Sequence, residues 1–429
     1  MSIAEVYLWG TRIGAVYQDN VFSTPVFSYD PEFIKSGIEV APITMPLRDQ
    51  VYSFPGLPKE TFHGLPGLLA DSLPDKFGTK LIERYLSDRG RDIQSLTAVE
   101  RLLYTGKRGM GALEYVPAVD YASSDDSSID IDALVNLASE ILTDRENLHI
   151  RGDEHAMEQI INVGTSAGGA RAKAVVAWNP DTNDIRSGQV DAGSGYEYWL
   201  IKFDGVSNNK DKGEKADGTV YTRIEYAYYL MAELAGIDMS KCRLYEESGN
   251  YHFMTKRFDR TESGEKLHMQ SLGAMAHYDY NTPGIYSYEQ AYSIMNKIGL
   301  GQKEAEQLFR RMIFNIYARN QDDHVKNISF LMDKTGHWHL SPAYDITYAN
   351  DEANRWLARH QMTINGKTEN FSIDDLIECG KHMNLSKGKI YEIMSDVSDA
   401  LNLWASCAEK SFVGEKEMEY IKKHFNIIS

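Results

Sequence analysis

The chain opens with alternating apolar and polar residues. Val6 and Leu8 precede a glycine at position 10, and Ile13 and Tyr17 continue the alternation after it. A period of two residues is typical of strands with one buried face, and a glycine between two such runs favours a tight turn. The pattern therefore predicts an antiparallel meander over the first part of the chain.

Further along, the spacing of apolar residues changes from one segment to the next. Strand-like runs occupy residues 173–178, 196–203 and 251–258, and a hairpin is expected over 328–345. Apolar residues at helical spacing predict helices over residues 75–85, 222–235, 288–298, 302–318, 390–405 and 415–425. Strands come first, a mixed region follows, and helices dominate the end, so we expect an α+β fold.

A stretch rich in Asp and Ser over residues 120–130 is the best candidate for a linker. We therefore expect three domains, over residues 1–118, 131–260 and 261–429. The first would combine a β meander with helices. The second would be a small strand-rich lobe with a Gly-rich loop, and the third a mostly helical lobe.

Composition limits the possible functions. The 429 residues are 42% hydrophobic and 25% charged, which are globular proportions. The net charge of −17 repels phosphate backbones, so direct nucleic-acid binding is not expected. Three widely spaced cysteines, Cys242, Cys379 and Cys407, argue against a disulfide framework. We see neither a signal peptide nor a membrane-spanning run, so we expect a cytoplasmic protein without membrane contact.

The densest polar cluster covers residues 319–327, between a predicted helix and a predicted strand. Asn327 follows Asp322 by five residues, which is the Asp-to-Asn spacing of the protein-kinase catalytic loop. Asp345 comes just after the expected hairpin. A carboxylate that accepts the hydroxyl proton and two oxygen ligands for Mg²⁺ are what phosphoryl transfer requires. Lys326 would lie close to the transferred phosphate.

A Gly-rich segment over residues 163–173 is a second candidate. It lacks the Gly-Lys-Ser/Thr ending of a Walker A loop, but Gly164, Ser166 and Gly168 match the G-x-S-x-G pattern of serine hydrolases. That nucleophile motif needs a strand before it and a helix after it, whereas a strand is expected to follow here. The context favours a loop that folds over nucleotide phosphates, and the hydrolase is kept as an alternative.

Lys202 is the third candidate because it interrupts an otherwise apolar strand. A lysine on a half-buried strand needs a partner. A strand lysine that binds nucleotide phosphates fits this position, with Glu225 on the following helix as a possible ion-pair partner. The other explanation is a lysine at a sheet edge with its ammonium in solvent.

Several motifs occur together along nearly the whole chain. They cover residues 69–75 (Leu-Ala-Asp-Ser-Leu-Pro-Asp), 257–260 (Arg-Phe-Asp-Arg), 323–327 (Asp-His-Val-Lys-Asn), 341–345 (Ser-Pro-Ala-Tyr-Asp) and 362–367 (Met-Thr-Ile-Asn-Gly-Lys). With these motifs the chain resembles the HipA family of serine/threonine kinases, the toxins of bacterial HipBA toxin–antitoxin modules. Residues 1–118 resemble the N-terminal domain of that family.

The resemblance implies a kinase-like bilobal α+β fold, with ATP and Mg²⁺ as cofactors. It implies Asp322 as the catalytic base, and Asn327 and Asp345 as the metal ligands. Residues 256–258 would line the adenine mostly through their backbone. The implied ATP-binding residues are Gly168, Gly169, Ala170, Arg171, Ala172, Lys173, Lys202, Lys256, Arg257, Phe258, His324, Lys326, Asn327, Tyr344 and Asp345.

Ser166 lies where the family carries a serine whose autophosphorylation ejects the loop and silences the enzyme. The resemblance also implies a HipB-like DNA-binding antitoxin as partner and a translation component, such as an aminoacyl-tRNA synthetase, as substrate. Residues 168–173 read Gly-Gly-Ala-Arg-Ala-Lys, where better-known members have Ala-Gly-Ala-Gln-Glu-Lys. Two alternatives to an active kinase stay open: a serine hydrolase that uses Ser166 with His324 and an aspartate, and a catalytically quiet pseudokinase that binds an antitoxin.

Overall fold

The computed structural model describes residues 1–119, 129–143, 160–161, 163–164, 171–189, 192–206 and 220–428. The chain folds into two compact units. Unit 1 contains Met1–Thr219, Tyr245–Gln270 and Leu331–His337, and unit 2 contains Val220–Leu244, Ser271–Phe330 and Trp338–Ser429. The expected domain boundaries at 118, 131 and 260 stay a prediction.

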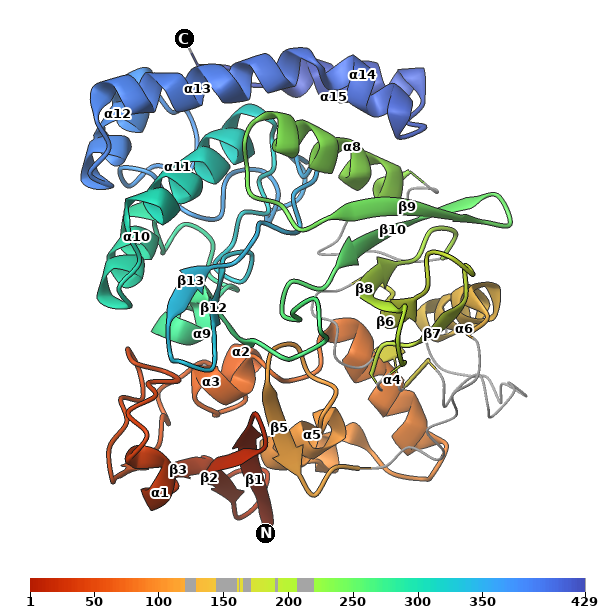
Figure 1. Ribbon diagram of the computed structural model, residues 1–429, viewed down its shortest axis with the longest axis vertical. Helices are drawn as coiled ribbons and strands as arrows, with labels where there is room; N and C mark the ends of the chain where they lie inside the picture. The colour runs from red at the N-terminus through yellow and green to blue at the C-terminus, as the bar shows by residue number, and fades with distance from the viewer. Residues whose placement is uncertain are drawn as a thin grey trace. The chain divides into compact units, whose positions relative to one another are not determined.

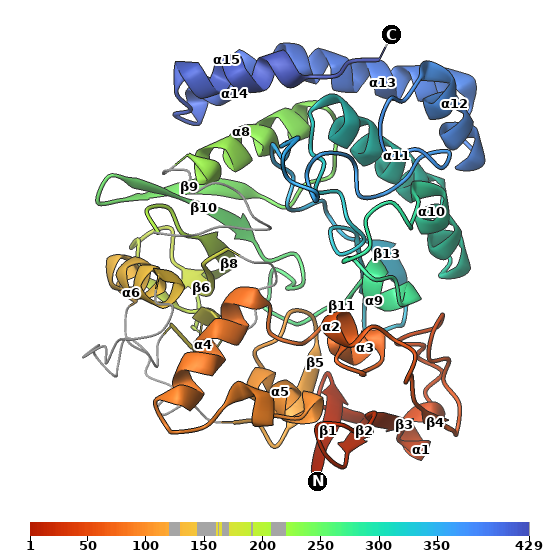
Figure 2. The same cartoon turned by 180° about the vertical axis from the view of Figure 1, so that it is seen from behind.

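The first sheet of unit 1 has the strand order β4-β3-β2-β1-β5 (Figures 1 and 2). Its strands are β1 (Ser2–Leu8), β2 (Thr11–Gln18), β3 (Val26–Tyr29), β4 (Val51–Tyr52) and β5 (Leu113–Val116). The pairs β1–β2 and β2–β3 are antiparallel, so the meander expected from the alternation is confirmed. Gly10 has a φ of 79° between β1 and β2, a conformation that glycine adopts without a steric penalty.

Unit 1 also contains several helices. They are α1 (Pro31–Ile34), α2 (Lys59–Phe62), α3 (Gly67–Ala70), α4 (Lys76–Ser87), α5 (Ala98–Thr105) and α6 (Ile131–Thr143), with a 3₁₀ turn at Ile93–Ser95. The helix expected over 75–85 corresponds to α4. Asp75 begins this helix because its side chain accepts a hydrogen bond from Gly78 N at 2.6 Å.

A second sheet has the order β7-β6-β8-β10-β9, and its strand β9 contains residues of both units. Its strands are β6 (Lys173–Trp178), β7 (Ile185–Ser187), β8 (Glu197–Lys202), β9 (Cys242–Glu247) and β10 (Asn250–Lys256). Ala174 and Val176 of β6 share one apolar cluster with Trp199 of β8 and with Phe77 and Leu81 of α4. In Figure 2, α4 lies beside β6 and β8, so its apolar side covers this sheet.

A third sheet has the order β11-β12-β13. Its strands are β11 (His268–Ser271), β12 (Ser329–Met332) and β13 (Trp338–Leu340). β12 and β13 form the hairpin expected over 328–345, since Asp333 N bonds to His337 O and Ser341 N bonds to Ser329 O. The start of β12 and the end of β13 therefore lie at the same end of the hairpin.

Unit 2 is mainly helical, as the spacing of apolar residues predicts. Its helices are α8 (Tyr221–Leu234), α9 (Leu272–Ala276), α10 (Tyr288–Lys297), α11 (Gln302–Tyr317), α12 (Ile373–His382), α13 (Lys387–Asn402), α14 (Trp404–Lys410) and α15 (Glu415–His424). The helices α12–α15 form a layer over α8 and α11 (Figure 1). Trp404, with no exposed area, packs edge-on against Tyr228 at 5.5 Å between ring centroids and anchors this layer.

One sequence expectation for unit 2 needs correction. Residues 390–405 do not form one helix, because α13 ends and α14 begins at Leu403. Helix α12 was not expected from the sequence.

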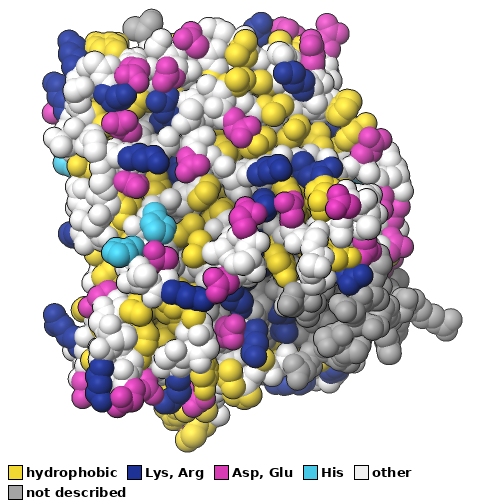
Figure 3. All heavy atoms as spheres, in the orientation of Figure 1, with side chains coloured by type: hydrophobic (Ala, Val, Ile, Leu, Met, Phe, Trp, Pro, Cys, Tyr) yellow, Lys and Arg dark blue, Asp and Glu magenta, His cyan; other side chains and the backbone are white. Residues whose placement is uncertain are grey.

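Other sequence-based expectations concern the cysteines, the membrane and the surface charge. All three cysteines are free and buried. No helix among the described residues is long and apolar enough to cross a membrane. On the face drawn in Figure 3, acidic and basic side chains of the described residues are interspersed rather than sorted into separate areas.

Candidate active site

The predicted catalytic loop follows directly after α11 in unit 2. Arg319 has a φ of 58°, which turns the chain at the end of the helix. Asn320 N then donates to Asn315 O at 2.9 Å, and Asn320 forms a parallel bridge with Ala349. A rigid helix thus sets the place and direction in which the loop begins.

Asn327 closes the loop onto its own first residue. Its Nδ2 donates to Asp322 O at 2.8 Å, and its backbone N donates to His324 O, also at 2.8 Å. Gly273 N bonds to Val325 O at 3.0 Å from outside the loop. The five-residue spacing therefore has a local structural reason. At this spacing the loop turns back, so that the Asn327 side chain reaches the carbonyl of Asp322.

Two neighbouring aspartates of this loop have opposite environments. The Asp322 side chain is 24% exposed, whereas the Asp323 side chain is 2% exposed. Of the two, only the Asp322 carboxylate is therefore open to a substrate hydroxyl. This arrangement supports Asp322, and not Asp323, as the candidate base.

Asp323 is the acceptor at the centre of a buried network. Its Oδ2 accepts from Tyr288 OH at 2.9 Å and lies 3.0 Å from His360 Nδ1, and its Oδ1 accepts from Gln361 N at 2.8 Å. Asn315 Nδ2 in turn donates to Tyr288 OH at 3.0 Å. A buried carboxylate is tolerated only when its acceptor sites are satisfied in this way. The network fastens the predicted catalytic loop to α10, α11 and the segment at residues 360–361.

Gln361 is a site residue that the sequence did not reveal. Its Nε2 donates to Asp322 Oδ1, while its backbone N is held by Asp323. An ionised carboxylate accepts hydrogen bonds, so the nitrogen and not the oxygen of the amide faces Asp322. Gln361 directly precedes the motif at 362–367, but a bond between residues 39 positions apart has no local sequence signal.

The two expected metal ligands lie at the same end of the β12–β13 hairpin. Asn327 comes two residues before β12, and Asp345 comes five residues after β13. Because Nδ2 of Asn327 is bonded to the loop, its oxygen Oδ1 is the end that can bind a cation. Mg²⁺ is commonly held by one or two protein oxygens, with water and phosphates completing the shell, so these residues fit the ion.

The described residues contain no cluster of three or more His, Cys, Asp or Glu that could hold a metal. A dedicated protein cage for a cation is therefore not part of the described structure. Asp345 has a φ of 52°, in a region that Asp tolerates better than most residues.

The other loop residues brace the site. Tyr344 OH donates to Lys326 O at 2.5 Å and lies 2.5 Å from Ser329 Oγ. Lys326 Nζ is 5.1 Å from the centroid of the Tyr280 ring, which is a cation–π distance. His324 Nε2 lies 3.9 Å from Asp322 Oδ1. The roles of Tyr344, Lys326 and His324 in ATP binding stay predictions.

The expected nucleotide lysines belong to unit 1, where they lie directly opposite each other. Lys173 on β6 pairs with Lys202 on β8, and Lys202 pairs with Phe253 on β10. Directly opposite residues of antiparallel strands share one face of a sheet, so the two side chains leave their strands on the same face. Lys173 is buried and forms an ion pair with Asp75 at 3.3 Å. Glu225 belongs to unit 2, and its pairing with Lys202 stays a prediction.

The segment expected at the adenine follows β10 and is held by a buried ion cluster. Arg257 Nε and Nη2 donate to the two oxygens of Asp259 at 2.9 and 2.7 Å, and Arg260 Nη1 donates to Asp259 Oδ2 at 2.8 Å. Burial alone would raise the pKa of Asp259, but the two arginines outweigh it and lower that pKa. The Arg257 side chain thus forms a buried ion pair with Asp259.

Two neighbours of Arg257 are also part of the ATP prediction. Lys256 Nζ pairs with Glu197 at 2.9 Å, and Phe258 lies in the turn that follows β10. The prediction that residues 256–258 contact adenine through their backbone stays untested.

Part of the Gly-rich loop lies outside the described residues. Ser166, Gly168, Gly169 and Ala170 belong to this part, and the predictions for them remain predictions. Of the rest, Arg171 is partly exposed, and Ala172 is buried with its carbonyl bonded to Phe203 N at 3.2 Å.

The serine hydrolase can be weighed from the described flanks of Ser166. Residues 160, 161, 163 and 164 are helical, and β6 follows at Lys173. The order is helix before and strand after, which is the reverse of the strand–serine–helix order that a nucleophile elbow requires. The local structure therefore does not favour the hydrolase.

Two protein-family models match parts of the chain. The model of the HipA-like C-terminal domain matches residues 165–404, and that of the HipA N-terminal domain matches residues 4–116. A Haemophilus influenzae protein named "Putative kinase" is 29% identical over 194 residues, which cover 38% of this chain and 55% of that protein. The chain thus matches about half the length of this curated relative.

Solved structures with a similar fold include a chain of the Shewanella oneidensis MR-1 toxin–antitoxin complex of HipA, HipB and operator DNA. It aligns with a TM-score of 0.67 at 16% identity, over 98% of this chain and 95% of that chain. The proinflammatory kinase CtkA of Helicobacter pylori aligns with a TM-score of 0.38 at 11% identity, over 60% of this chain and 86% of that chain. The alignment with the HipA chain, together with the mixed strands and helices described above, confirms the α+β kinase-like fold expected from the sequence.

Proposed function

The chain belongs to the HipA family, and on this basis we propose that it is an ATP- and Mg²⁺-dependent protein serine/threonine kinase. The observation that carries the proposal is the loop of residues 322–327 in unit 2. It presents a partly exposed Asp322 carboxylate, fixes the Asn327 amide by a bond at 2.8 Å, and is held by the buried Asp323. Phosphoryl transfer requires a carboxylate for the hydroxyl proton and oxygen ligands for Mg²⁺, and this loop offers the first and one of the second.

Each group would have one task. Asp322 would orient the substrate hydroxyl and accept its proton, with Gln361 holding Oδ1 of the carboxylate. Asn327 Oδ1 and Asp345 would hold Mg²⁺, which neutralises charge on the phosphates when bound. Lys202 and the Gly-rich loop would bind the phosphates, and residues 256–258 the adenine.

The relatives suggest the partners. One structurally similar chain comes from a complex of HipA, HipB and operator DNA, so we propose a HipB-like DNA-binding antitoxin as the partner of this chain. The substrate would be a serine or threonine of a translation component, such as an aminoacyl-tRNA synthetase. Autophosphorylation of Ser166 would silence the enzyme.

Transfer from radiolabelled ATP tests the proposal. The wild-type protein should label itself or an added substrate with Mg²⁺, and EDTA should abolish the labelling. Asp322→Asn should bind ATP but transfer roughly 10²–10⁴ times more slowly, because a carboxamide cannot accept the proton. Near-normal transfer by a folded Asp322→Asn protein would refute the base assignment, and ATP binding without transfer by the wild type would identify a pseudokinase.

A further inference from the structure

A buried ion pair joins the N-terminal part of unit 1 to the strand that carries the first nucleotide lysine. Lys173 Nζ lies 3.3 Å from Asp75 Oδ2, and the two side chains are 3% and 6% exposed. Asp75 lies in the region matched by the HipA N-terminal domain, whereas Lys173 lies in the region matched by the C-terminal domain. Removing two charges from water costs free energy that only close mutual contact offsets. The pair is therefore a specific connection between the two matched regions.

The two oxygens of Asp75 have different tasks. Oδ1 accepts from Gly78 N at 2.6 Å and begins α4, while Oδ2 faces Lys173. Phe77 and Leu81 of α4 pack in the same apolar cluster as Ala174 of β6. The carboxylate is therefore held by a helix that is itself packed against the sheet.

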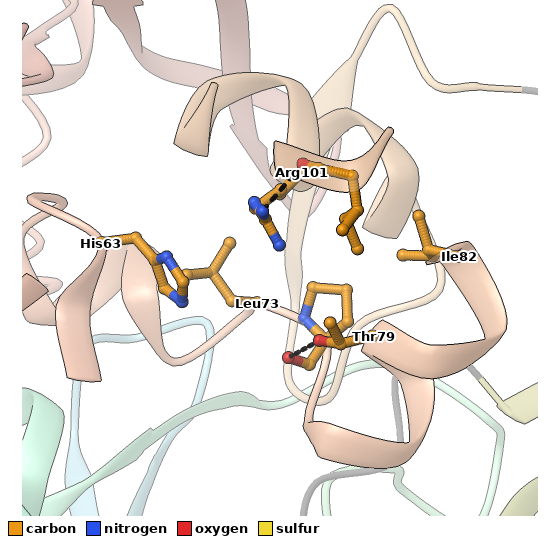
Figure 4. Close-up of a pocket in the computed structure, with 7 residues that line it drawn as sticks. His63, Leu73, Thr79, Ile82 and Arg101 are labelled. Carbon is orange, nitrogen blue, oxygen red and sulfur yellow. Dashed lines mark hydrogen bonds between the residues drawn. The ribbon is translucent and has the colours of Figure 1, made fainter. Parts of the chain in front are cut away.

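The turn before Asp75 is also fixed from its other side. Thr105 Oγ1 of α5 donates to Ser72 O at 2.9 Å, and Thr79 Oγ1 lies 3.4 Å from Pro74 O. Leu73 and Pro74 line a small pocket together with Thr79, Ile82, Ile93, His63 and Arg101 (Figure 4). Residues of the N-terminal region thus surround the turn and determine where the Asp75 carboxylate lies.

The charges of the two strand lysines suggest a function for the Asp75 carboxylate. Lys173 and Lys202 lie directly opposite each other on one face, where like charges repel. Asp75 contributes one negative charge at the ammonium of Lys173. Protein kinases likewise need an ion pair between their phosphate-binding strand lysine and an acidic residue on a helix. Lys173 is also the last residue of the Gly-rich segment and the first of β6, so fixing its side chain fixes the end of that segment.

We propose that Asp75 is a positioning residue for nucleotide binding. It holds Lys173 and the end of the Gly-rich segment in place beside Lys202, so that the N-terminal domain forms a functional part of the nucleotide site. This inference rests on the proposed kinase function.

Two substitutions of Asp75 separate its charge from its role as a helix cap. Asp75→Asn keeps a good cap but removes the charge opposite Lys173, whereas Asp75→Glu keeps the charge but is a poorer cap. In the full-length protein, Asp75→Asn should raise the KM for ATP by about tenfold or more while kcat changes much less. Asp75→Glu should have a KM closer to that of the wild type.

Asp30→Asn is the matched control. Asp30 also begins a helix and pairs with a cation, Arg12 at 2.6 Å, in the same N-terminal region. Its substitution should leave the KM for ATP unchanged. The thermal unfolding of every variant without ATP is measured alongside, because a purely structural loss would lower the unfolding temperature without a selective change in KM.

The outcomes distinguish this inference from the proposed function. If the wild type neither binds nor uses ATP, both the proposed kinase function and the positioning role of Asp75 are wrong. If the wild type is active and Asp75→Asn has an unchanged or lower KM, only the positioning role is wrong. An equal rise in KM for Asp75→Glu and Asp75→Asn would also overturn it, since the charge would then not be the cause. A double variant of Asp75→Asn with Lys173→Gln should show less than the sum of the two single effects.

Discussion

Asp322 and Asp323 are neighbours of the same chemical type, and their replacement should have opposite consequences. Asp323→Ala removes the acceptor of three buried donors, from Tyr288, His360 and Gln361. Each buried donor without an acceptor costs roughly 1–3 kcal/mol, so the loss should be on the order of 5 kcal/mol. That is a large share of the roughly 5–15 kcal/mol by which a domain is stable.

Asp322→Ala should leave stability almost unchanged. Its side chain is 24% exposed, and water can replace it at the Gln361 amide. We expect a cost of at most about 1 kcal/mol. Phosphoryl transfer, in contrast, should fall by roughly 10²–10⁴.

Urea denaturation followed by circular dichroism measures the stability of both variants, and labelled ATP measures transfer by the folded fraction. Asp399→Ala, at an exposed position of α13, is the control and should change neither quantity. Equal destabilisation by Asp322→Ala and Asp323→Ala, or wild-type stability of Asp323→Ala, would refute the distinction between a base and a buried support.

Three further predictions address the metal, the switch and the pH. Asp345→Ala should weaken ATP binding in calorimetry much more with Mg²⁺ than without it; equal losses would mean a structural role. Phosphate should appear on Ser166 by mass spectrometry after incubation with Mg²⁺ and ATP, and Ser166→Asp should bind ATP more weakly than Ser166→Ala, since added negative charge repels the nucleotide. Burial lowers the pKa of His252 to about 4, so the unfolded chain takes up a proton that the native protein does not. His252 should therefore contribute a loss of stability on the order of 2 kcal/mol at pH 5 as the pH drops from about 6.5 towards 4, and His252→Gln should lose that much less over the same range in urea titrations.

The sequence predicted several regular elements from a continuous apolar run or from the helical spacing of apolar residues. The run at 173–178 matches β6 residue for residue, and the periods at 302–318 and 415–425 differ from α11 and α15 by one residue at the C-terminal end. The break at Leu403 was not visible, because apolar residues continue at helical spacing through it. Leu403 has a φ of −91° and a ψ of 4°, which most residues can adopt. The end of α13 therefore needs no glycine or proline, and none marks it in the sequence.

The candidate site could be predicted only as far as its groups are close in sequence. The spacing of Asp322 and Asn327 is local, and the structure explains it by a bond from the Asn327 side chain to Asp322 O. Gln361 reaches the same aspartate from 39 residues away, through a backbone position that the buried Asp323 determines. Nothing in the order of residues near Gln361 indicates this contact.

The lysines of the second sheet also have neighbours that the sequence could not predict. Lys202 stood out because a charge interrupts an apolar strand, but its like-charged neighbour Lys173 depends on the register of β6 against β8, which periodicity does not determine. The partner of Lys173 lies further away still, at Asp75, which the sequence placed in the motif at 69–75 and at the start of a helix but not beside a lysine. A cation on a strand therefore predicts that an anion must be near, while the fold alone decides which carboxylate supplies it. Since that carboxylate comes from the N-terminal region, removing its charge without removing the helix cap tests whether this region shares in nucleotide binding or only in folding.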